Sequence, residues 1–550
     1  MKKRAYGIDL GTTYSCIACI GDSGKPEVQQ NSDGERTTPS VVWFDDNRVV
    51  VGEEAKGMAP VCPHDVASFI KREMGSDSFT FSCQKGDLRP EQISAYILKK
   101  LVQDANNRLG EDIKDVVITG PAYFSFRERE ATKAAGEIAG LNVLEILNEP
   151  TAAAISYGLS SEKATGTSHV MVYDLGGGTF DVTIIEVSPR GINVVCTDGN
   201  HKLGGKDWDD RIIQLLVDKF QRATGIMHDL YADPSAMQEL MHMAERSKKA
   251  LSAKTEITEA FNYGGEKHRL TITRDEFEEA SSDLLAETVN FTRDVINTAH
   301  QKGIQTIDKL ILVGGSTRMP QVARALREEF NMEPQMYDPD EAVAKGAAIV
   351  AMANILRMEI GDEFALETDD GGFTLETQER LKEVADEAGF TLETLTTILT
   401  PTSNVCSKSF GEQLFHMADK CHRVFNIIYR NTNLPVEASL TSYTMEDNQQ
   451  FVKVIICENM EDATDDVLTH GVDPELSTVL WEGLLKIQPG LPKESPMETV
   501  FRLDESGLLH VLSRDPASGN EITAEIQTSS TIDKDELNRM RKSMTHDTVE

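Results

Sequence analysis

Short apolar runs alternate with amphipathic stretches over the first two thirds of the chain. Apolar runs stand at 116–119, 170–173 and 310–313, and stretches with helical periodicity stand at 126–139 and 209–220. A short apolar run predicts a buried strand, whereas apolar residues spaced three and four apart predict one face of a helix. Strands that alternate with helices indicate a layered α/β domain, which we place at residues 1–357.

The pattern changes twice after this domain. Residues 358–402 are acidic, and they carry the sequence Gly-Phe-Thr-Leu-Glu-Thr twice, at 372–377 and 389–394. We interpret this segment as a linker or insert. Residues 403–530 alternate apolar and polar positions between turn residues, which predicts a mainly β, sandwich-like domain. A short helix or tail is expected at 531–550.

The charge balance excludes some functions. The 550 residues contain 55 Lys and Arg against 90 Asp and Glu, for a net charge of −35. Such an acidic chain repels phosphate backbones, so we expect no nucleic-acid partner. Nowhere does the sequence approach the roughly 20 apolar residues of a membrane-spanning helix. The N-terminus is basic, but Asp9 interrupts its apolar stretch, so a cytoplasmic protein without a membrane partner is expected.

Eight cysteines are scattered without a dense framework, which indicates free thiols. Cys16 and Cys19 form a C-x-x-C. Residues three apart on a strand point to opposite faces, and there is no second C-x-x-C to complete a zinc site. We therefore expect neither a redox pair nor a metal centre there.

Two similar glycine turns are the most informative motifs. Residues 7–14 (Gly-Ile-Asp-Leu-Gly-Thr-Thr-Tyr) and 174–181 (Asp-Leu-Gly-Gly-Gly-Thr-Phe-Asp) each place an aspartate at the end of a strand and a glycine turn before the next strand. Successive backbone amides in such turns can bind anionic oxygens. Neither turn has the spacing of a P-loop. Two matching turns predict a duplicated fold with phosphates held between its halves, and the aspartates require a cation such as Mg²⁺ between themselves and the phosphates.

Two more glycine clusters stand at 203–207 and 313–318. The first precedes a helical pattern, and the second lies between a strand and a helical pattern. A glycine turn before a helix N-terminus is a place where a nucleotide can lie against the backbone. Taken alone, each cluster is better interpreted as an ordinary loop.

These motifs resemble the 70-kDa heat-shock (DnaK-type) chaperone family. The resemblance rests on both aspartate turns and on residues 143–154, 314–318 and 338–348, and it extends over about residues 5–353. It implies an actin-like (ribonuclease H-like, duplicated) ATPase domain whose two lobes close over ATP or ADP, with Mg²⁺ and K⁺ as further cofactors.

The resemblance also implies roles for individual residues. It assigns catalytic roles to Lys71, Asp9, Glu149, Asp174 and Thr179, and it places metal ions at Asp9, Asp174 and Asp181. A lysine ammonium can orient the attacking water and offset charge that develops on the γ-phosphate. The implied nucleotide contacts are Gly11, Thr12, Thr13, Tyr14, Gly177, Gly178, Thr179, Gly204, Gly205, Glu245, Lys248, Lys249, Ser252, Gly314, Gly315, Ser316, Arg318 and Asp340. Without the resemblance, most of the charged residues among them would be interpreted as solvent-facing.

The β domain resembles the family's substrate-binding domain more weakly, through residues 431–435, 446–449 and 506–511. By position, Val424, Met445 and Val452 would line a groove for an extended peptide, which such domains bind through main-chain hydrogen bonds and apolar pockets. An ordinary role in the sandwich core is an equal alternative for each of the three residues.

Three features depart from the family. The resemblance predicts that this chain lacks the C-terminal helical lid. The short hydrophobic linker of the family is replaced by the acidic insert, in which 395–399 is the nearest remnant. Glu145 stands where the family has an arginine that engages J-domain co-chaperones, and a glutamate would repel their acidic signature. The last two features argue against ordinary co-chaperone stimulation and interdomain coupling.

The sequence therefore predicts an ATP-dependent, stress-response type chaperone that binds unfolded or specific polypeptide clients, with a nucleotide exchange factor as a further partner. The alternative is a nucleotide-dependent scaffold for one dedicated partner, with weak or uncoupled ATPase activity. A small-molecule kinase of the same superfamily is a third hypothesis, but no acidic base outside the nucleotide site supports it.

Overall fold

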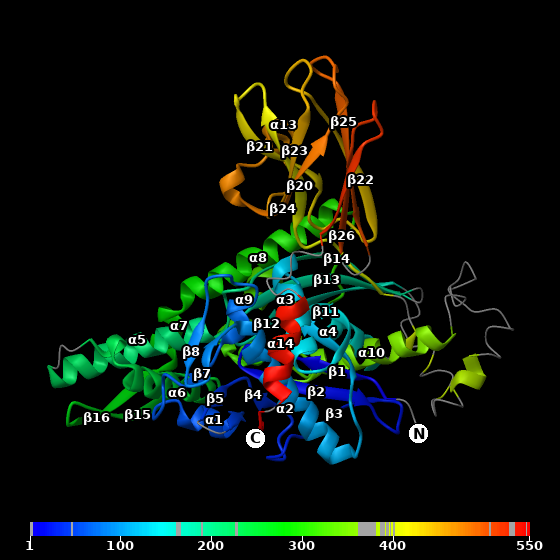
Figure 1. Ribbon diagram of the computed structural model, residues 1–550. Coiled ribbons are helices and arrows are strands. Elements are labelled where there is room, and N and C mark those ends of the chain that lie inside the picture. The colour runs from blue at the N-terminus through cyan, green and yellow to red at the C-terminus, as the bar shows by residue number, and fades with distance from the viewer. Residues whose placement is uncertain are drawn as a thin grey trace.

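The computed structural model describes residues 4–45, 48–160, 167–188, 191–225, 229–360, 381–385, 391, 395, 398–399, 402–504, 508–526, 534–545 and 547–550. These residues form a mixed α/β unit with several sheets, on which a mainly β unit stands (Figure 1). None of the described helices is long and apolar enough to cross a membrane.

The first large sheet of the α/β unit contains the first aspartate turn. Its strand order is β11-β10-β1-β2-β3, with β1 parallel to β10 and antiparallel to β2. The turn with Asp9 joins β1 to β2. The strands of this sheet are β1 (Tyr6–Asp9), β2 (Tyr14–Ile20), β3 (Pro26–Val28), β10 (Asp115–Gly120) and β11 (Asn142–Asn148).

The second large sheet repeats this arrangement. Its order is β18-β17-β12-β13-β14, with β12 parallel to β17 and antiparallel to β13. The turn with Asp174 joins β12 to β13, so both aspartate turns occupy the same place in their sheets. This shared topology shows that the fold is duplicated. The strands are β12 (Ser168–Leu175), β13 (Phe180–Ser188), β14 (Gly191–Asn200), β17 (Lys309–Val313) and β18 (Pro334–Met336).

Two helices, α4 (Glu149–Ser160) and α10 (Ala342–Ile360), pack against the strands that carry the aspartate turns. The α10 backbone lies so close to β1 and to α4 that glycine is required at the contacts. A Cβ on Gly7 of β1 would lie 2.1 Å from the Ala348 nitrogen of α10, and one on Gly346 would lie 1.8 Å from the Ala152 oxygen of α4. Both helices contribute buried residues to a core that also includes residues of both sheets.

Further helices cover the outer faces of the two sheets. On the first sheet α2 and α3 contribute to one core, and on the second sheet α5, α6, α8 and α9 contribute to another. Their bounds are α2 (Pro90–Leu109), α3 (Phe126–Ile138), α5 (Gly205–Thr224), α6 (Pro234–Leu251), α8 (Ser282–Gln301) and α9 (Pro320–Phe330). The smaller elements include α1 (Glu53–Met58), α7 (Arg274–Ala280), β4 (Thr38–Pro39), β5 (Val42–Phe44), β6 (Val49–Val51), β7 (Val66–Ala67), β8 (Phe81–Cys83), β9 (Gly86–Leu88), β15 (Glu256–Tyr263) and β16 (Glu266–Thr273).

All eight cysteines are free thiols. Cys16 and Cys19 lie on β2 and are buried in different clusters, because they point to opposite faces of the strand. The strand predicted for these residues is confirmed.

The β unit consists of two four-stranded antiparallel sheets, ordered β21-β20-β23-β24 and β22-β25-β26-β27. Both sheets contribute to one core, which includes Phe410, Ile456, Phe501 and Val511. The strands are β20 (Ser409–His416), β21 (Cys421–Ile428), β22 (Val436–Tyr443), β23 (Phe451–Asn459), β24 (Ser477–Lys486), β25 (Pro496–Leu503), β26 (Leu509–Arg514) and β27 (Glu521–Ile526), and α13 (Asp465–His470) lies between β23 and β24 in the chain.

Polar contacts attach the β unit to the edge of the second large sheet. The strand β19 (Thr402–Ser403) pairs with β14 in parallel. The guanidinium of Arg430 lies 2.7 Å from an Asp198 carboxylate oxygen, and Asn431 Oδ1 accepts a 2.9 Å hydrogen bond from the Thr197 amide. Asp198 and Thr197 both belong to β14, so this strand carries most of the junction described.

The described residues of the predicted linker do not all face solvent. Leu381, Ala385, Leu395, Ile398 and Leu399 are buried in the core formed around α4 and α10. The remnant at 395–399 thus packs into the α/β unit through its apolar positions. Both copies of the duplicated hexapeptide lie outside the described residues, except for Thr391.

The C-terminal segment returns to the α/β unit. The helix α14 (Lys534–Thr545) packs beside α3, as the red helix in Figure 1 shows, and Val549 forms a parallel bridge with Val49 of β6. Met544 and Val549 are buried in the core of the first sheet. Asp547 accepts hydrogen bonds from Tyr96 Oη and Lys85 Nζ, both at 2.5 Å. The end of the chain therefore completes the first half of the fold.

We expect Asp547→Ala to lower the free energy of unfolding of the α/β unit by about 1–3 kcal/mol, because the buried Tyr96 hydroxyl would lose its acceptor. Chemical denaturation followed by circular dichroism measures the change. Asp112→Ala is the control, since the Asp112 side chain is 78% exposed beside Lys114 and should change stability by less than about 0.5 kcal/mol. Equal effects of both substitutions would contradict the anchoring role of Asp547.

Candidate functional site

A cavity of about 530 Å³ opens where the two aspartate turns meet. Its walls come from both large sheets, from α6 and from the segments after β17 and β18. Residues as distant in sequence as Asp9 and Asp340 therefore line one space. This volume is within the range of small-molecule sites.

The two aspartate turns contact each other at the cavity wall. A Cβ on Gly177 would lie 2.2 Å from Thr13 Oγ1, and one on Gly178 would lie 2.3 Å from Thr12 Cγ2. Within the first turn, a Cβ on Gly11 would lie 2.0 Å from the Tyr14 oxygen. The glycines are needed because the turns approach more closely than any side chain permits.

Four carboxylates gather at the floor of the cavity, on β1, α4, β12 and β13. Asp174 and Asp181 lie directly opposite each other in the β12–β13 pair. Burial, followed by the charge of Glu149, raises the pKa of Asp9 to about 7 and that of Asp181 to about 8. The pKa of Asp174 lies well above its ordinary value, first because of burial and then because of Glu149 and Asp181. These shifts express the free energy needed to hold like charges together away from water.

The carboxylate cluster fits a hydrated divalent cation. Asp181 is buried, and within the described part of the chain its Oδ1 has no hydrogen-bond partner. Carboxylate oxygens are hard donors of the kind that Mg²⁺ selects. Asp9, Asp174 and Asp181 could therefore hold such a cation, either directly or through water.

Lys71 supplies a positive charge to the same cluster. It belongs to the short helix η1 (Ile70–Glu73), which follows Phe69 in the left-handed backbone region at φ 59°. Its buried ammonium donates a hydrogen bond to Glu149 Oε1. The next residue, Arg72, donates to the Gly178 carbonyl at 3.0 Å and binds the Asp207 carboxylate, which ties this helix to the second turn.

A set of charged residues joins the two halves above the turns. Lys56 and Lys249 both donate to the Tyr14 hydroxyl, at 3.0 and 3.1 Å. The same two lysines bind Glu245. Burial alone would raise the pKa of Glu245, but Lys56 and Lys249 outweigh it and lower the pKa to about 2. Glu245 is therefore ionised throughout the physiological range, and this contact should be lost only as the pH falls toward 2.

The wall beside α6 is built from backbone and side-chain contacts together. Lys248 Nζ donates to the Gly205 carbonyl at 2.7 Å and to Asp209 Oδ2 at 2.8 Å. Ser316 Oγ donates to the Gly176 carbonyl at 2.9 Å. Burial raises the pKa of Asp209 to about 6 although Lys248 opposes the shift. These contacts fix three glycine segments around one space.

The model of a known family, described as Hsp70 protein, matches residues 5–383 and 417–550 of this chain. The match includes both halves of the duplicated fold and most of the β unit. This chain belongs to the Hsp70 family. Members of this family are ATPases that use ATP or ADP with Mg²⁺ and act as chaperones.

Most of the residues that the Hsp70 resemblance singled out lie around the cavity. Those that line it are Asp9, Gly11, Thr12, Thr13, Tyr14, Lys71, Glu149, Asp174, Gly177, Thr179, Glu245, Lys248, Lys249, Ser252, Gly314, Gly315, Ser316, Arg318 and Asp340. Gly178, Asp181, Gly204 and Gly205 are not among the lining residues. They lie behind residues that line the cavity. A Cβ on Gly204 would lie 2.6 Å from the Thr179 amide, and one on Gly205 would lie 2.4 Å from Ser316 Oγ.

Sequence reasoning missed several polar residues at this Hsp70 site, notably Lys56, Arg72, Asp207 and Asp209. Lys56 and Asp209 line the cavity, and Arg72 bridges to Asp207. Asp207 and Asp209 stand in or just after the glycine cluster at 203–207, and Arg72 follows Lys71, but no local pattern shows which partners these residues have. Only the tertiary fold brings them to the site.

The three residues predicted to line a peptide groove do not form one cluster. Val424 is fully buried with Val467 and Val472, under α13. Met445 is 41% exposed, whereas Val452 is half-buried against the shared core of the β unit. The groove therefore stays a prediction for these positions.

Glu145 lies on β11 and accepts a 3.0 Å hydrogen bond from the Asn354 side chain of α10. This contact gives the glutamate a place in the packing of the α/β unit. Its effect on co-chaperone binding stays a prediction.

The contact between the two turns predicts that two glycine substitutions change the free energy of unfolding by very different amounts. Gly178→Ala should lower the free energy of unfolding by about 1–3 kcal/mol, because the new methyl group overlaps Thr12. Gly57→Ala is the matched control, since Gly57 lies in α1 with open space around it and its replacement removes a poor helix former. Thermal unfolding measures both. A Gly178→Ala protein as stable as Gly57→Ala would show that the turns do not touch.

Proposed function

We propose that this Hsp70 chain is an ATP-dependent chaperone whose α/β unit is an actin-like ATPase domain and whose β unit is a sandwich domain that binds polypeptides. The single observation that carries the proposal is the arrangement at the cavity floor, where two touching glycine turns bring Asp9 and Asp174 together beside the Lys71–Glu149 pair. This arrangement suits a triphosphate with its metal ion. The predicted nucleotide contacts fit this role by lining the cavity or by contacting its lining from behind.

The proposed reaction is in-line attack of water on the γ-phosphate. Bound Mg²⁺ would offset the charge of the phosphate oxygens, and K⁺ would add to this effect. The Thr12, Thr13 and Thr179 hydroxyls, together with the turn amides, would orient the phosphates. Lys71 would stabilise the charge that develops on the γ-phosphate and hold the attacking water, while Glu149 fixes the position of the ammonium.

Most of the exposed large apolar side chains among the described residues belong to the β unit, which supports a polypeptide-binding role. Its exposed large apolar residues are Phe415, Met417, Tyr443, Met445, Phe451, Leu468, Leu476, Val479 and Leu484. Exposed apolar groups that gather on one part of a protein mark interaction sites. In the proposed role, extended clients bind this unit near Met445 and Val452, and a nucleotide exchange factor acts on the ATPase domain.

A nucleotide-dependent scaffold for one dedicated partner is the second candidate. It is favoured by the junction at β14, where Arg430 and Asn431 hold the β unit, and by the burial of Leu395 and Leu399 in the α/β core. A junction fixed by buried contacts leaves less freedom for nucleotide-driven domain movement. Glu145 in place of the family's arginine also favours this candidate.

Lys71→Ala should retain binding of Mg²⁺ and ATP but reduce turnover by a factor of about 100 or more, because the charge that develops on the γ-phosphate would lose the Lys71 ammonium. Calorimetry measures binding, and single-turnover hydrolysis measures the chemical step. Lys219→Ala is the control, since Lys219 forms a similar ion pair with Glu276 on the surface. Unchanged turnover in Lys71→Ala would remove the catalytic assignment.

Extended apolar peptides distinguish the chaperone from the scaffold. If the chain is a chaperone, such peptides should raise the steady-state ATPase rate several-fold, and ATP should release them, as fluorescence anisotropy of a labelled peptide would report. A peptide of the same length, in which acidic residues replace the apolar ones, is the control. An ATPase that responds to no peptide, together with recovery of one stable partner, would support the scaffold instead.

A further inference from the structure

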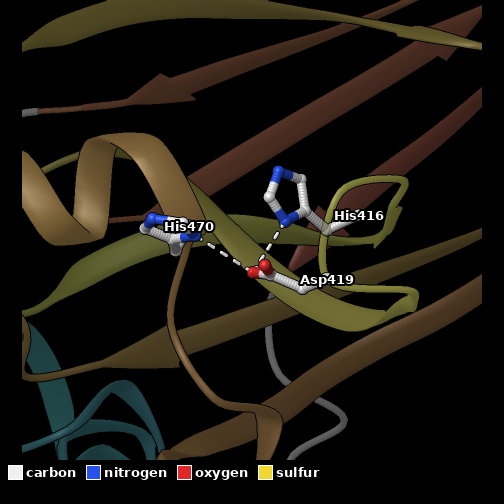
Figure 2. A group of neighbouring side chains, drawn as sticks. All are labelled: His416, Asp419 and His470. Carbon is white, nitrogen blue, oxygen red and sulfur yellow. Dashed lines mark hydrogen bonds and ion pairs between the residues drawn. The ribbon is translucent and has the colours of Figure 1, made fainter.

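Two histidines and an aspartate converge on the β unit, outside the cavity described above. His416 ends β20, Asp419 lies in the turn to β21, and His470 ends α13. His416 Nδ1 lies 2.9 Å and His470 Nδ1 lies 3.1 Å from Asp419 Oδ2. Figure 2 shows both imidazole rings directed at the one carboxylate. Neither histidine belongs to the motifs that indicated a nucleotide site.

We propose that His416, Asp419 and His470 bind a divalent transition-metal ion of the Zn²⁺ type, with water as the remaining ligand. The three donor atoms all lie within 4.8 Å of one another. Tetrahedral Zn²⁺ holds its nitrogen and oxygen ligands about 3.3 Å apart, so small rotations of these side chains would suffice. Two imidazoles with one carboxylate select transition metals, whereas Mg²⁺ and Ca²⁺ prefer all-oxygen sites.

The surrounding packing holds the donors in place. The His416 ring packs edge-on against Phe425, with 5.5 Å between the ring centroids. Gly471 follows His470 at φ 67°, and a Cβ there would lie 2.9 Å from the Val424 oxygen and 3.4 Å from Phe425 Cε1. The end of α13 is therefore pressed against β21. Donors on such fixed backbone lose little freedom when they bind an ion.

The site joins the β20–β21 hairpin to α13, and this connection has a structural consequence. Val424 on β21 exchanges backbone hydrogen bonds of 2.8 and 2.7 Å with Val472, just after α13, and it is buried beside Val467 of that helix. A bound ion would hold α13 and Val472 over Val424. The metal site stands independently, but an effect on peptide access to Val424 rests on the proposed function.

The site can be tested by titrating Zn²⁺ into the full-length chain against a chromophoric chelator, after all metal has been removed. His416→Ala, His470→Ala and Asp419→Asn should each bind one Zn²⁺ fewer than the wild type, or bind it with an affinity lower by about tenfold or more. His510→Ala is the matched control, because His510 faces Asp504 at 3.8 Å in a surface pair that belongs to no three-ligand group among the described residues. Zn²⁺ bound by cysteines would persist in every variant and so cannot imitate this result.

Binding by all three variants that equals the wild type would overturn the site, and circular dichroism would show that each variant is folded. Hydrogen exchange tests separately whether a bound ion holds α13 and Val472 over Val424. The Gly471 amide, which donates to Val467, and the Val424 amide should exchange more slowly with Zn²⁺ in the wild type and in His510→Ala only. Zn²⁺ binding without this protection would show that the ion does not hold α13 over Val424. Neither readout involves ATP, so failure here is distinct from failure of the proposed ATPase.

Discussion

Repulsion among buried carboxylates is the constraint on which the rest of this structure depends. Glu149, Asp174 and Asp181 are buried and Asp9 is half-buried beside them, and desolvation combined with their mutual charge raises the pKa of the three aspartates. Each buried charge costs free energy unless a charge of opposite sign offsets it. Lys71 offsets part of this charge, and a metal ion that accompanies phosphates would offset more. The proposed ATPase thus explains a feature that is unfavourable for stability alone.

The duplicated fold is what makes this cluster possible. Each large sheet ends a parallel strand with an aspartate and continues through a glycine turn, and α4 and α10 pack both sheets against one core. Gly177 and Gly178 let the second turn touch the threonines of the first. Charged contacts such as Lys56–Glu245 and Arg72–Asp207 then hold the halves in register. The β unit and the C-terminal segment both attach to this frame, the former at β14 and the latter at β6.

The sequence predicts those parts of the fold and site that depend on local chemistry. The aspartate turns, the alternation of strands and helices and the change to β structure near residue 403 each leave a pattern within a few residues. Arg72 and Asp209 leave none, because their partners lie elsewhere in the chain. The return of α14 and Val549 to the first core was equally hidden, since a few apolar residues in a polar segment do not indicate where they pack. Acidic composition likewise did not predict that Leu395 and Leu399 would be buried.

The most direct test of the central claim is calorimetric titration of the wild-type chain with ADP and with ATP, in the presence of Mg²⁺ and then of a chelator. We expect one nucleotide bound per chain, with affinity that falls by about tenfold or more when Mg²⁺ is removed, since the carboxylates would then face the phosphates directly. Absence of binding in the presence of Mg²⁺ would contradict this expectation, as would equal affinity with and without the ion.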